Sequence, residues 1–543
     1  SNATRMNVVY VGANDGFLHG FRAGAYTAAG IFDTTAPNDG QELLGYMPSS
    51  ALATIHNTTS ALDFSSPSYS HALFVDATPG TGDLYYNGAW HTWLVGGMGA
   101  GGNAGGPISD ATTTATGGAI FALDITNPAI FSEANAASLV IGDWGPNGTA
   151  ISCVGNNPAN CGNNLGSTFG TPIIRRLHDG NWAAIFGNGL NSSTGTAGIY
   201  IMEVDRATGA ISFRFLDTGY GPSKDPLGAG NKNGIAYVSS ADLDGDHITD
   251  FVDAGDVFGN RWRFDLTSNS AALWTTGASP LFSTPAGQPI TTRVTVTSAL
   301  AGSAPARVMV DFGTGQELPQ NLTNAATYAS GTQSIYGIWD WNMSAWNGKG
   351  SVQYSIPTTA PAKITTSMLQ TQTAIDVGGG TGNISGYRTV TQNPICWSGS
   401  STCSTGTNNQ FGWKLALPDS GEQIVYNPTT AYGLFIVNTT IPVANQALSC
   451  SNQPPSGYTM AIAADTGGAP NISFFANATN NFVSANGAIV SGIGLSAVGT
   501  PSFVSAETKP YMVNQTAPGI PQITQVNAGA NGIGARLNWI KLR

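Results

Sequence analysis

The sequence predicts an all-β fold, a single modified seven-bladed β-propeller with long loop insertions. Three observations predict it: the composition, a strand pair that is repeated along the chain, and the scarcity of helical patterns. Only 9% of the 543 residues are charged and 70 are Gly, and low charge with abundant Gly, Thr and aromatic residues favours short strands joined by tight turns. Long amphipathic helices need apolar residues in periodic stripes, which few windows of this chain supply.

The repeated unit is an apolar strand that ends near Gly, then a loop, then a second strand that closes on Asp or on a Thr-Gly turn. Its first copy is VVYVGANDGFLHGFRAG at 8–24. Further copies lie at 92–128, 182–211 and 249–268, and looser ones at 307–342 and 432–469. Such strand pairs cannot bury both faces alone, but they cover one another when they are arranged radially.

The blade count follows from these copies and from the end of the chain. The tail ARLNWIKLR (535–543) has the pattern of a lone strand that completes a terminal blade, which gives about seven blades of about 40–50 residues each, plus insertions. The expected insertions are the Gly-, Asn- and Thr-rich stretches at 99–118, 145–168 and 376–410. No linker divides the chain, so we expect one propeller domain over 4–543. Residues 1–3 (SNA) are typical of an expression-tag remnant.

The cysteines predict two local disulfides. Cys153 and Cys161 bracket one polar loop, and Cys396 and Cys403 bracket another, as in exported proteins stabilised by short bridges. Cys450 is then left unpaired. The alternative is free thiols in exposed loops. Neither pair has the two-to-four-residue spacing of a zinc knuckle.

Charge argues against a nucleic-acid partner, and the length of the apolar runs argues against a membrane-spanning helix. The formal net charge is −11, and the 20 Lys and Arg residues are scattered, whereas phosphate binding needs clustered basic side chains. No uninterrupted apolar run reaches the roughly 18 residues that a membrane-spanning helix requires. We therefore expect no nucleic-acid partner and no membrane span.

The stretch ADLDGDHITD (241–250) places four acids at alternate positions. Calcium prefers six to eight oxygen ligands, and a loop with acids at positions 1, 3, 5 and 9 turns them toward one centre, with a backbone carbonyl from position 7. The stretch therefore predicts a Ca²⁺ site. Its expected ligands are the side chains of Asp242, Asp244, Asp246 and Asp250 and the carbonyl of Ile248, with water completing the shell.

This loop departs from the usual EF-hand pattern. Gly245 and His247 stand at positions 4 and 6, where an EF-hand has its Gly at position 6. Asp253 stands at position 12 and falls within an expected strand, so we interpret it as a strand residue and not as a ligand. The flanking segments are also strand-like, and we expect the loop to lie on a blade. The alternatives are a solvated Asp-Gly turn and Mg²⁺, which is less suited because it demands octahedral geometry and keeps several waters.

Six motifs follow one another along the chain: VVYVGANDGFLHGF (8–21), GQELLGYMPS (40–49), WLVGGMGAGG (93–102), GAIFALDITNP (118–128), FGTPIIRRLHDGNWAAIFGNG (169–189) and DLDGDHITDFVDAGDVFGNRWRFDL (242–266). In this order they resemble the C-terminal domain of the PilC/PilY family of type IV pilus biogenesis and adhesion proteins. The resemblance covers essentially the whole chain. It implies a modified seven-bladed propeller with one Ca²⁺ site.

The family also implies a function. We expect a non-enzymatic, calcium-binding module of a pilus biogenesis and tip adhesion protein that regulates pilus extension and retraction, twitching motility and surface attachment. The implied partners are minor and major pilins and host or abiotic surfaces. The implied location is the bacterial outer surface after export, associated with the outer membrane or the pilus tip, and we expect a monomeric domain.

The enzymatic alternative is a quinoprotein-like propeller dehydrogenase, whose Asp-x-x-Thr-Gly turns resemble VDRATG (204–209) and AADTGG (463–468). Such enzymes typically stack their quinone on a ring formed by two adjacent cysteines, and no two cysteines of this chain are adjacent. We therefore expect no enzyme and no catalytic residues.

Two further patterns carry no predicted chemistry. Gly97, Gly99 and Gly102 match G-x-G-x-x-G, but a nucleotide fingerprint must open a helix, and more Gly, Asn and Pro follow here, so we expect a propeller loop. The histidines show no metal-binding spacing, and we expect packing or surface roles for His19, His56, His71, His91, His178 and His247.

Overall fold

The computed structural model is built almost wholly of antiparallel strands. It describes residues 4–543 except 57–59, 62, 70–72, 102–117, 146–147, 156–160, 300–306, 319–324, 342–362, 400–402, 404–405, 444, 446–449, 478, 507–508, 530–533 and 537–543. His71, Gly102, residues 1–3 and most of the expected insertion at 99–118 therefore lie outside the described residues. Among the described helices, none combines the length and the apolar character needed to cross a bilayer.

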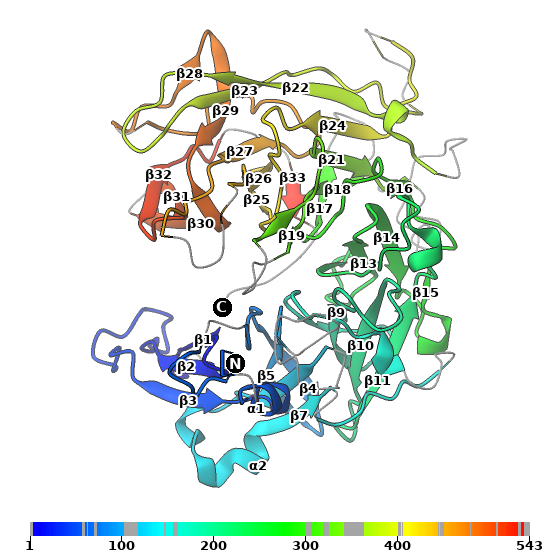
Figure 1. Cartoon of the computed structure of the whole chain (residues 1–543), viewed down its shortest axis with the longest axis vertical. Helices are drawn as coiled ribbons and strands as arrows, with labels where there is room; N and C mark the ends of the chain where they lie inside the picture. The colour runs from blue at the N-terminus through cyan, green and yellow to red at the C-terminus, as the bar shows by residue number, and fades with distance from the viewer. Residues whose placement is uncertain are drawn as a thin grey trace.

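The first half of the chain forms four sheets that follow one another around a common centre (Figure 1). The first sheet comprises β1 (Val8–Gly12), β2 (Leu18–Arg22) and β3 (Glu42–Tyr46). The second comprises β4 (Gly80–Tyr86), β5 (Ala89–Gly97), β6 (Ile120–Asp124) and β7 (Val140–Trp144). The third comprises β8 (Ile173–Arg176), β9 (Trp182–Gly187), β10 (Gly198–Val204) and β11 (Ile211–Asp217). The fourth comprises β12 (Val238–Ala241), β13 (Phe251–Gly255), β14 (Asn260–Asp265), β15 (Thr275–Thr276) and β16 (Phe282–Ser283).

The second half contains one sheet of 12 strands, with the order β25-β26-β27-β29-β23-β22-β24-β21-β18-β17-β33 and β28 paired to β29. Their bounds are β17 Thr295–Ala299, β18 Arg307–Gly313, β21 Ser334–Trp339, β22 Gln370–Val377, β23 Tyr387–Val390, β24 Gly412–Ala416, β25 Thr429–Ala431, β26 Leu434–Asn438, β27 Tyr458–Ala463, β28 Ser484–Ala485, β29 Ala488–Gly494 and β33 Gly534–Arg536.

Smaller elements complete the fold. β19 (Glu317–Leu318) pairs with β20 (Thr327–Tyr328), and a separate sheet comprises β30 (Ala497–Ala506), β31 (Lys509–Thr516) and β32 (Pro521–Gln525). The described α-helices are α1 (Ser49–Thr54) and α2 (Ala136–Leu139). Single 3-10 turns lie at Pro128–Ile130, Glu133–Asn135, Cys161–Asn164, Pro222–Lys224, Ala271–Leu273 and Thr366–Met368.

The propeller fold is confirmed, but the described residues do not form seven separate blades. Among the described strands, five blade-sized sheets are separate, whereas β33 and the strands from β17 to β29, except β19 and β20, merge into the 12-stranded sheet. The cause is β22, whose first half (370–373) pairs in parallel with β24, while its second half (374–377) pairs with β23. The backbone groups of β22 thereby bond to β24 in its first half and to β23 in its second half. The strands on the β24 side and those on the β23 side therefore form one continuous sheet.

The repeated strand pairs are confirmed as antiparallel neighbours: β1–β2, β5–β6, β9–β10, β13–β14, β18–β21 and β26–β27. The tail strand is partly confirmed, because Gly534–Arg536 pairs with β17, but that strand belongs to the 12-stranded sheet, and 537–543 lie outside the described residues. The expected insertion at 376–410 is wrong in part, since it contains β23. The aromatic and β-branched residues of that strand outweigh the surrounding Gly and Asn.

The structure forms both expected disulfides, Cys153–Cys161 and Cys396–Cys403, and leaves Cys450 free and exposed. Several large aromatic side chains lie in the core: Trp93, Trp262, Trp339 and Trp413 are all fully buried. Between the third and fourth sheets, Ile199 and Ile201 pack with Val252 and Trp262. Burial of each such side chain contributes roughly 1.5–3 kcal/mol, so apolar contact between neighbouring sheets holds the ring together.

His19 on β2 lies between two carboxylates of the first sheet. Its Nδ1 is 2.7 Å from Glu42 Oε1, and its Nε2 is 2.9 Å from Asp15 Oδ2. Burial disfavours the charged imidazole, but the hydrogen bonds to Glu42 and Asp15 outweigh it and raise the pKa of His19. Because both ring nitrogens donate only in the imidazolium, the first sheet is held best when His19 is protonated.

We predict a pH-dependent contribution of His19 to stability. A folded-state pKa above the unfolded value stabilises the protein fully below the unfolded pKa of about 6.5 and loses this effect as the pH rises through the folded pKa. Thermal unfolding of the wild type and of His19→Gln should therefore differ more at pH 5.5 than at pH 9. An equal difference at both pH values would contradict the assignment.

Candidate metal centre

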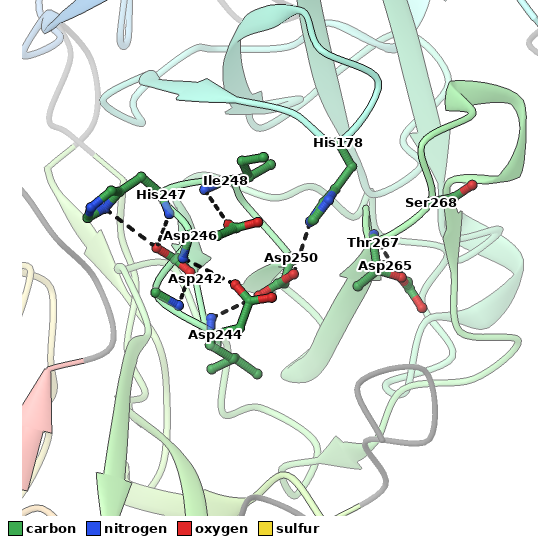
Figure 2. Close-up of polar contacts among 12 residues, drawn as sticks. His178, Asp242, Asp244, Asp246, His247, Ile248, Asp250, Asp265, Thr267 and Ser268 are labelled. Carbon is green, nitrogen blue, oxygen red and sulfur yellow. Dashed lines mark hydrogen bonds and ion pairs between the residues drawn. The ribbon is translucent and has the colours of Figure 1, made fainter. Parts of the chain in front are cut away.

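The aspartate loop closes a hairpin of the fourth sheet. β12 and β13 are antiparallel neighbours in which Ala241 pairs with Phe251, and residues 242–250 connect them (Figure 2). The backbone N–H of Asp250 donates to the Ala241 carbonyl at 2.9 Å and so closes the base of the loop. The expected position of the loop on a blade between two strands is confirmed.

Three carboxylates meet within this loop. One oxygen from each of Asp242, Asp244 and Asp250 lies within 4.8 Å of the others. Asp250 is fully buried, Asp242 is partly buried and Asp244 is exposed. Two like charges about 4 Å apart repel by about 1 kcal/mol in water and by about 4 kcal/mol at the effective dielectric of a protein surface. The cluster therefore gains from a cation placed at its centre.

Backbone N–H groups hold the acids in place. Asp242 accepts from Gly245 N at 2.8 Å and from His247 N at 2.9 Å, and Asp244 accepts from Asp246 N at 3.2 Å. Gly245 and His247 adopt φ of 78° and 66°, left-handed conformations that let the chain reverse. A carboxylate oxygen has two lone pairs, so these bonds leave room for a metal, and an all-oxygen donor set is the one that Ca²⁺ prefers.

The carboxylate of Asp246 is not part of this group of three. It is exposed and accepts from Ile248 N at 2.8 Å. Asp246 and the Ile248 carbonyl therefore stay predicted ligands, as does the identity of the ion. The side chain of His247 is 81% exposed, and its Nδ1 lies 4.0 Å from Asp242 Oδ2.

Asp253 is a strand residue, as expected, and it belongs to a buried charge network. It lies in β13 and pairs with Arg261 of β14, which also bonds Asp340 at 2.8 Å. Burial raises the pKa of Asp253, while Arg261 acts in the opposite direction. Since Asp340 follows β21, this network joins the fourth sheet to the 12-stranded sheet.

One site residue was not recognisable from the sequence. His178 Nε2 lies 3.0 Å from Asp250 Oδ1, and it comes from the turn between β8 and β9 in the neighbouring third sheet (Figure 2). The two residues are 72 positions apart, so no local spacing could indicate the contact. The expectation of a packing or surface role for His178 missed this contact with a predicted ligand.

Comparison with known proteins gives a consistent set of matches. A family model described as the PilY1 beta-propeller domain matches residues 1–376. The chain is 30% identical over 434 residues to the type IV pilus biogenesis factor PilY1 of Pseudomonas aeruginosa strain PAO1, covering 76% of this chain and 30% of that protein. It is 31% identical over 386 residues to a PilY1 homolog of Xylella fastidiosa, covering 67% and 22%.

A solved structure is also similar. The crystal structure of the Pseudomonas aeruginosa PilY1 C-terminal domain matches with a TM-score of 0.66 and 25% sequence identity, covering 97% of this chain and 93% of that one. The chain spans about a third or less of the length of the curated relatives that it matches. The likeness therefore concerns their propeller region.

We predict that Asp253 stabilises the fold without binding metal. Asp253→Asn should lower the free energy of unfolding by about 3 kcal/mol, because it leaves buried Arg261 with only part of its compensating charge. Denaturant unfolding would measure this loss. Calorimetric titration of the folded variant with Ca²⁺ should match the wild type, and a lost Ca²⁺ site would instead identify Asp253 as a ligand.

Proposed function

This chain belongs to the PilY1 β-propeller family, and we propose that it is the calcium-binding propeller of a type IV pilus biogenesis factor. The convergence of the Asp242, Asp244 and Asp250 carboxylates between two strands of one blade carries the calcium part of this proposal. The names of the relatives carry the pilus part. Those names describe pilus biogenesis and no enzymatic reaction, which favours a non-enzymatic module over a quinoprotein dehydrogenase.

The metal acts through charge and through loop order. Bound Ca²⁺ supplies a positive centre for the carboxylates of Asp242, Asp244, Asp246 and Asp250, with the Ile248 carbonyl and water as further oxygen ligands. This chain's own residues shape the loop: the N–H groups of 245–248 hold three of the acids. A loop preformed in this way loses less conformational entropy when it binds the ion.

Calcium then selects one state of the propeller. A ligand shifts a conformational equilibrium only through different affinities for the two states, and the repulsion among the acids penalises the compact loop when the ion is absent. The loaded loop favours the state in which the propeller surface contacts pilins and opposes pilus retraction. This coupling sets the balance of extension and retraction, and with it twitching motility and attachment to host or abiotic surfaces.

The proposed location is the bacterial surface or the pilus tip. The two local disulfides suit a protein that matures in an oxidising compartment. Extracellular calcium modules bind with dissociation constants of about 10⁻⁴–10⁻³ M, so the surface location also supplies the ion at a concentration that such a loop can sense.

We predict one Ca²⁺ per chain in calorimetric titration. Asp242→Asn, Asp244→Asn, Asp246→Asn and Asp250→Asn should each weaken binding by about tenfold or more, because each removes a charged ligand. Asp33→Asn is the matched control, since that partly buried Asp caps a turn through Thr35 N at 2.9 Å in the connection between β2 and β3 of the first sheet. Equal affinity in the wild type and the Asp242, Asp244 and Asp250 variants would refute the site. Equal affinity in Asp246→Asn alone would remove that residue from it.

We also predict a pilus phenotype. In the bacterium that produces this protein, Asp244→Ala should reduce surface piliation and twitching motility, whereas Asp33→Asn should not. Deletion of the retraction motor should restore piliation to the Asp244→Ala strain if the defect lies in the balance of extension and retraction. Normal piliation and motility in a strain whose variant folds but no longer binds Ca²⁺ would leave the metal a structural role only.

A further inference from the structure

We infer that His178 is the positioning residue of the metal loop and that it ties the loop to the neighbouring sheet. This inference rests on the proposed calcium function. The carboxylate of Asp250 is fully buried, and its two oxygens have different partners. Oδ1 is 3.0 Å from His178 Nε2, and Oδ2 accepts from Leu243 N at 2.8 Å. The first partner comes from the third sheet and the second from the loop itself.

Hydrogen bonds within and around it hold the turn that carries His178. Leu177 N donates to the Asn181 carbonyl at 2.9 Å, and Asp179 accepts from both the backbone N–H and the side-chain amide of Asn181 at 3.0 Å. The Asn181 side-chain oxygen in turn accepts from Arg206 N at 3.1 Å, which anchors the turn to the connection that follows β10. Leu177 is fully buried. His178 therefore projects from a fixed base and can hold Asp250 in one orientation.

A second hydrogen bond also joins the loop to the third sheet. Thr249 N, next to Asp250, donates to the Arg176 carbonyl at the end of β8 at 3.0 Å. The C-terminal side of the loop is thus attached to the third sheet by one backbone bond and one side-chain bond. The N-terminal side has contacts of a different kind, because Asp242 and Asp244 accept from N–H groups within the loop. The loop of the fourth sheet thus holds both sides of the cluster, and the third sheet also holds the C-terminal side.

In this arrangement Asp250 is the metal ligand, and His178 orients it from outside the loop. A buried ligand that is oriented by a hydrogen bond from outside the loop binds metal more tightly than one free to rotate, and loss of such an outer partner typically weakens metal binding 10- to 100-fold. Because coupling between two sites is reciprocal, Ca²⁺ that fixes Asp250 also strengthens the contact between the loop and the β8–β9 turn. The ion therefore stiffens the junction of the third and fourth sheets.

The experiment compares His178→Phe and His178→Gln with a matched pair elsewhere. His178→Phe fills the space without a donor, whereas the amide of Gln can donate to Asp250. The control is His91, whose Nδ1 lies 2.9 Å from Asp124 Oδ2 in the second sheet, and His91→Phe removes a similar pair far from the loop. Calorimetric titration with CaCl₂ gives the affinity, and hydrogen exchange with and without Ca²⁺ reports protection of the β8–β9 turn.

We expect His178→Phe to weaken Ca²⁺ binding about tenfold or more and to abolish the Ca²⁺-induced protection of the β8–β9 turn. His178→Gln should restore affinity to within about threefold of the wild type, and His91→Phe should leave it unchanged. If His178→Phe binds Ca²⁺ like the wild type, or if Gln fails to rescue a folded variant, the positioning role is wrong. A wild-type protein that binds no Ca²⁺ would instead overturn the proposed function, so the two failures are distinct.

Discussion

Antiparallel pairing of β12 with β13 is the constraint on which the metal centre depends. It fixes Ala241 opposite Phe251, so the connecting residues must turn back over a short base. That turn brings Asp242 and Asp250, at the two ends of the loop, to the same side, and Asp244 joins them. The pairing of the two strands does not itself require a cation. The fold therefore brings the like charges together, and backbone N–H groups of the loop hold the carboxylates by hydrogen bonds.

Charge is handled differently a few residues further along the chain. Asp253 and Arg261 are buried and paired in neighbouring strands, and Asp340 extends the pair to the next sheet. Such a network compensates its own charges and depends on good geometry to offset desolvation. In the loop, by contrast, Asp242, Asp244 and Asp250 each bring one carboxylate oxygen within 4.8 Å of the others. The fourth sheet thus contains buried charges that neutralise one another and, in the loop between β12 and β13, a group of acids suited to binding a cation.

Local features were predictable from the sequence and distant ones were not. The strand pairs were predictable because their two strands are close in sequence, and Gly and Asp mark the turns between them. The alternate aspartates indicated the loop, yet Ile248 N bonds the Asp246 carboxylate, a local competition that spacing alone does not reveal. The parallel pairing of β22 with β24 and the reach of His178 to Asp250 depend on chain segments far apart. No short pattern encodes such contacts, so the blade count and the role of His178 required the structure.

The continuous 12-stranded sheet has a mechanical consequence. In the first half of the chain, neighbouring sheets are held to one another mainly by apolar side chains, so tension across them pulls on packing surfaces. In the 12-stranded sheet, neighbouring strands are joined edge to edge by backbone hydrogen bonds. A load along these strands acts in shear on many hydrogen bonds at once. The junctions between the first four sheets and the interior of the 12-stranded sheet should therefore yield at different forces, with the junction of the third and fourth sheets, which lies beside the metal loop, on the softer side.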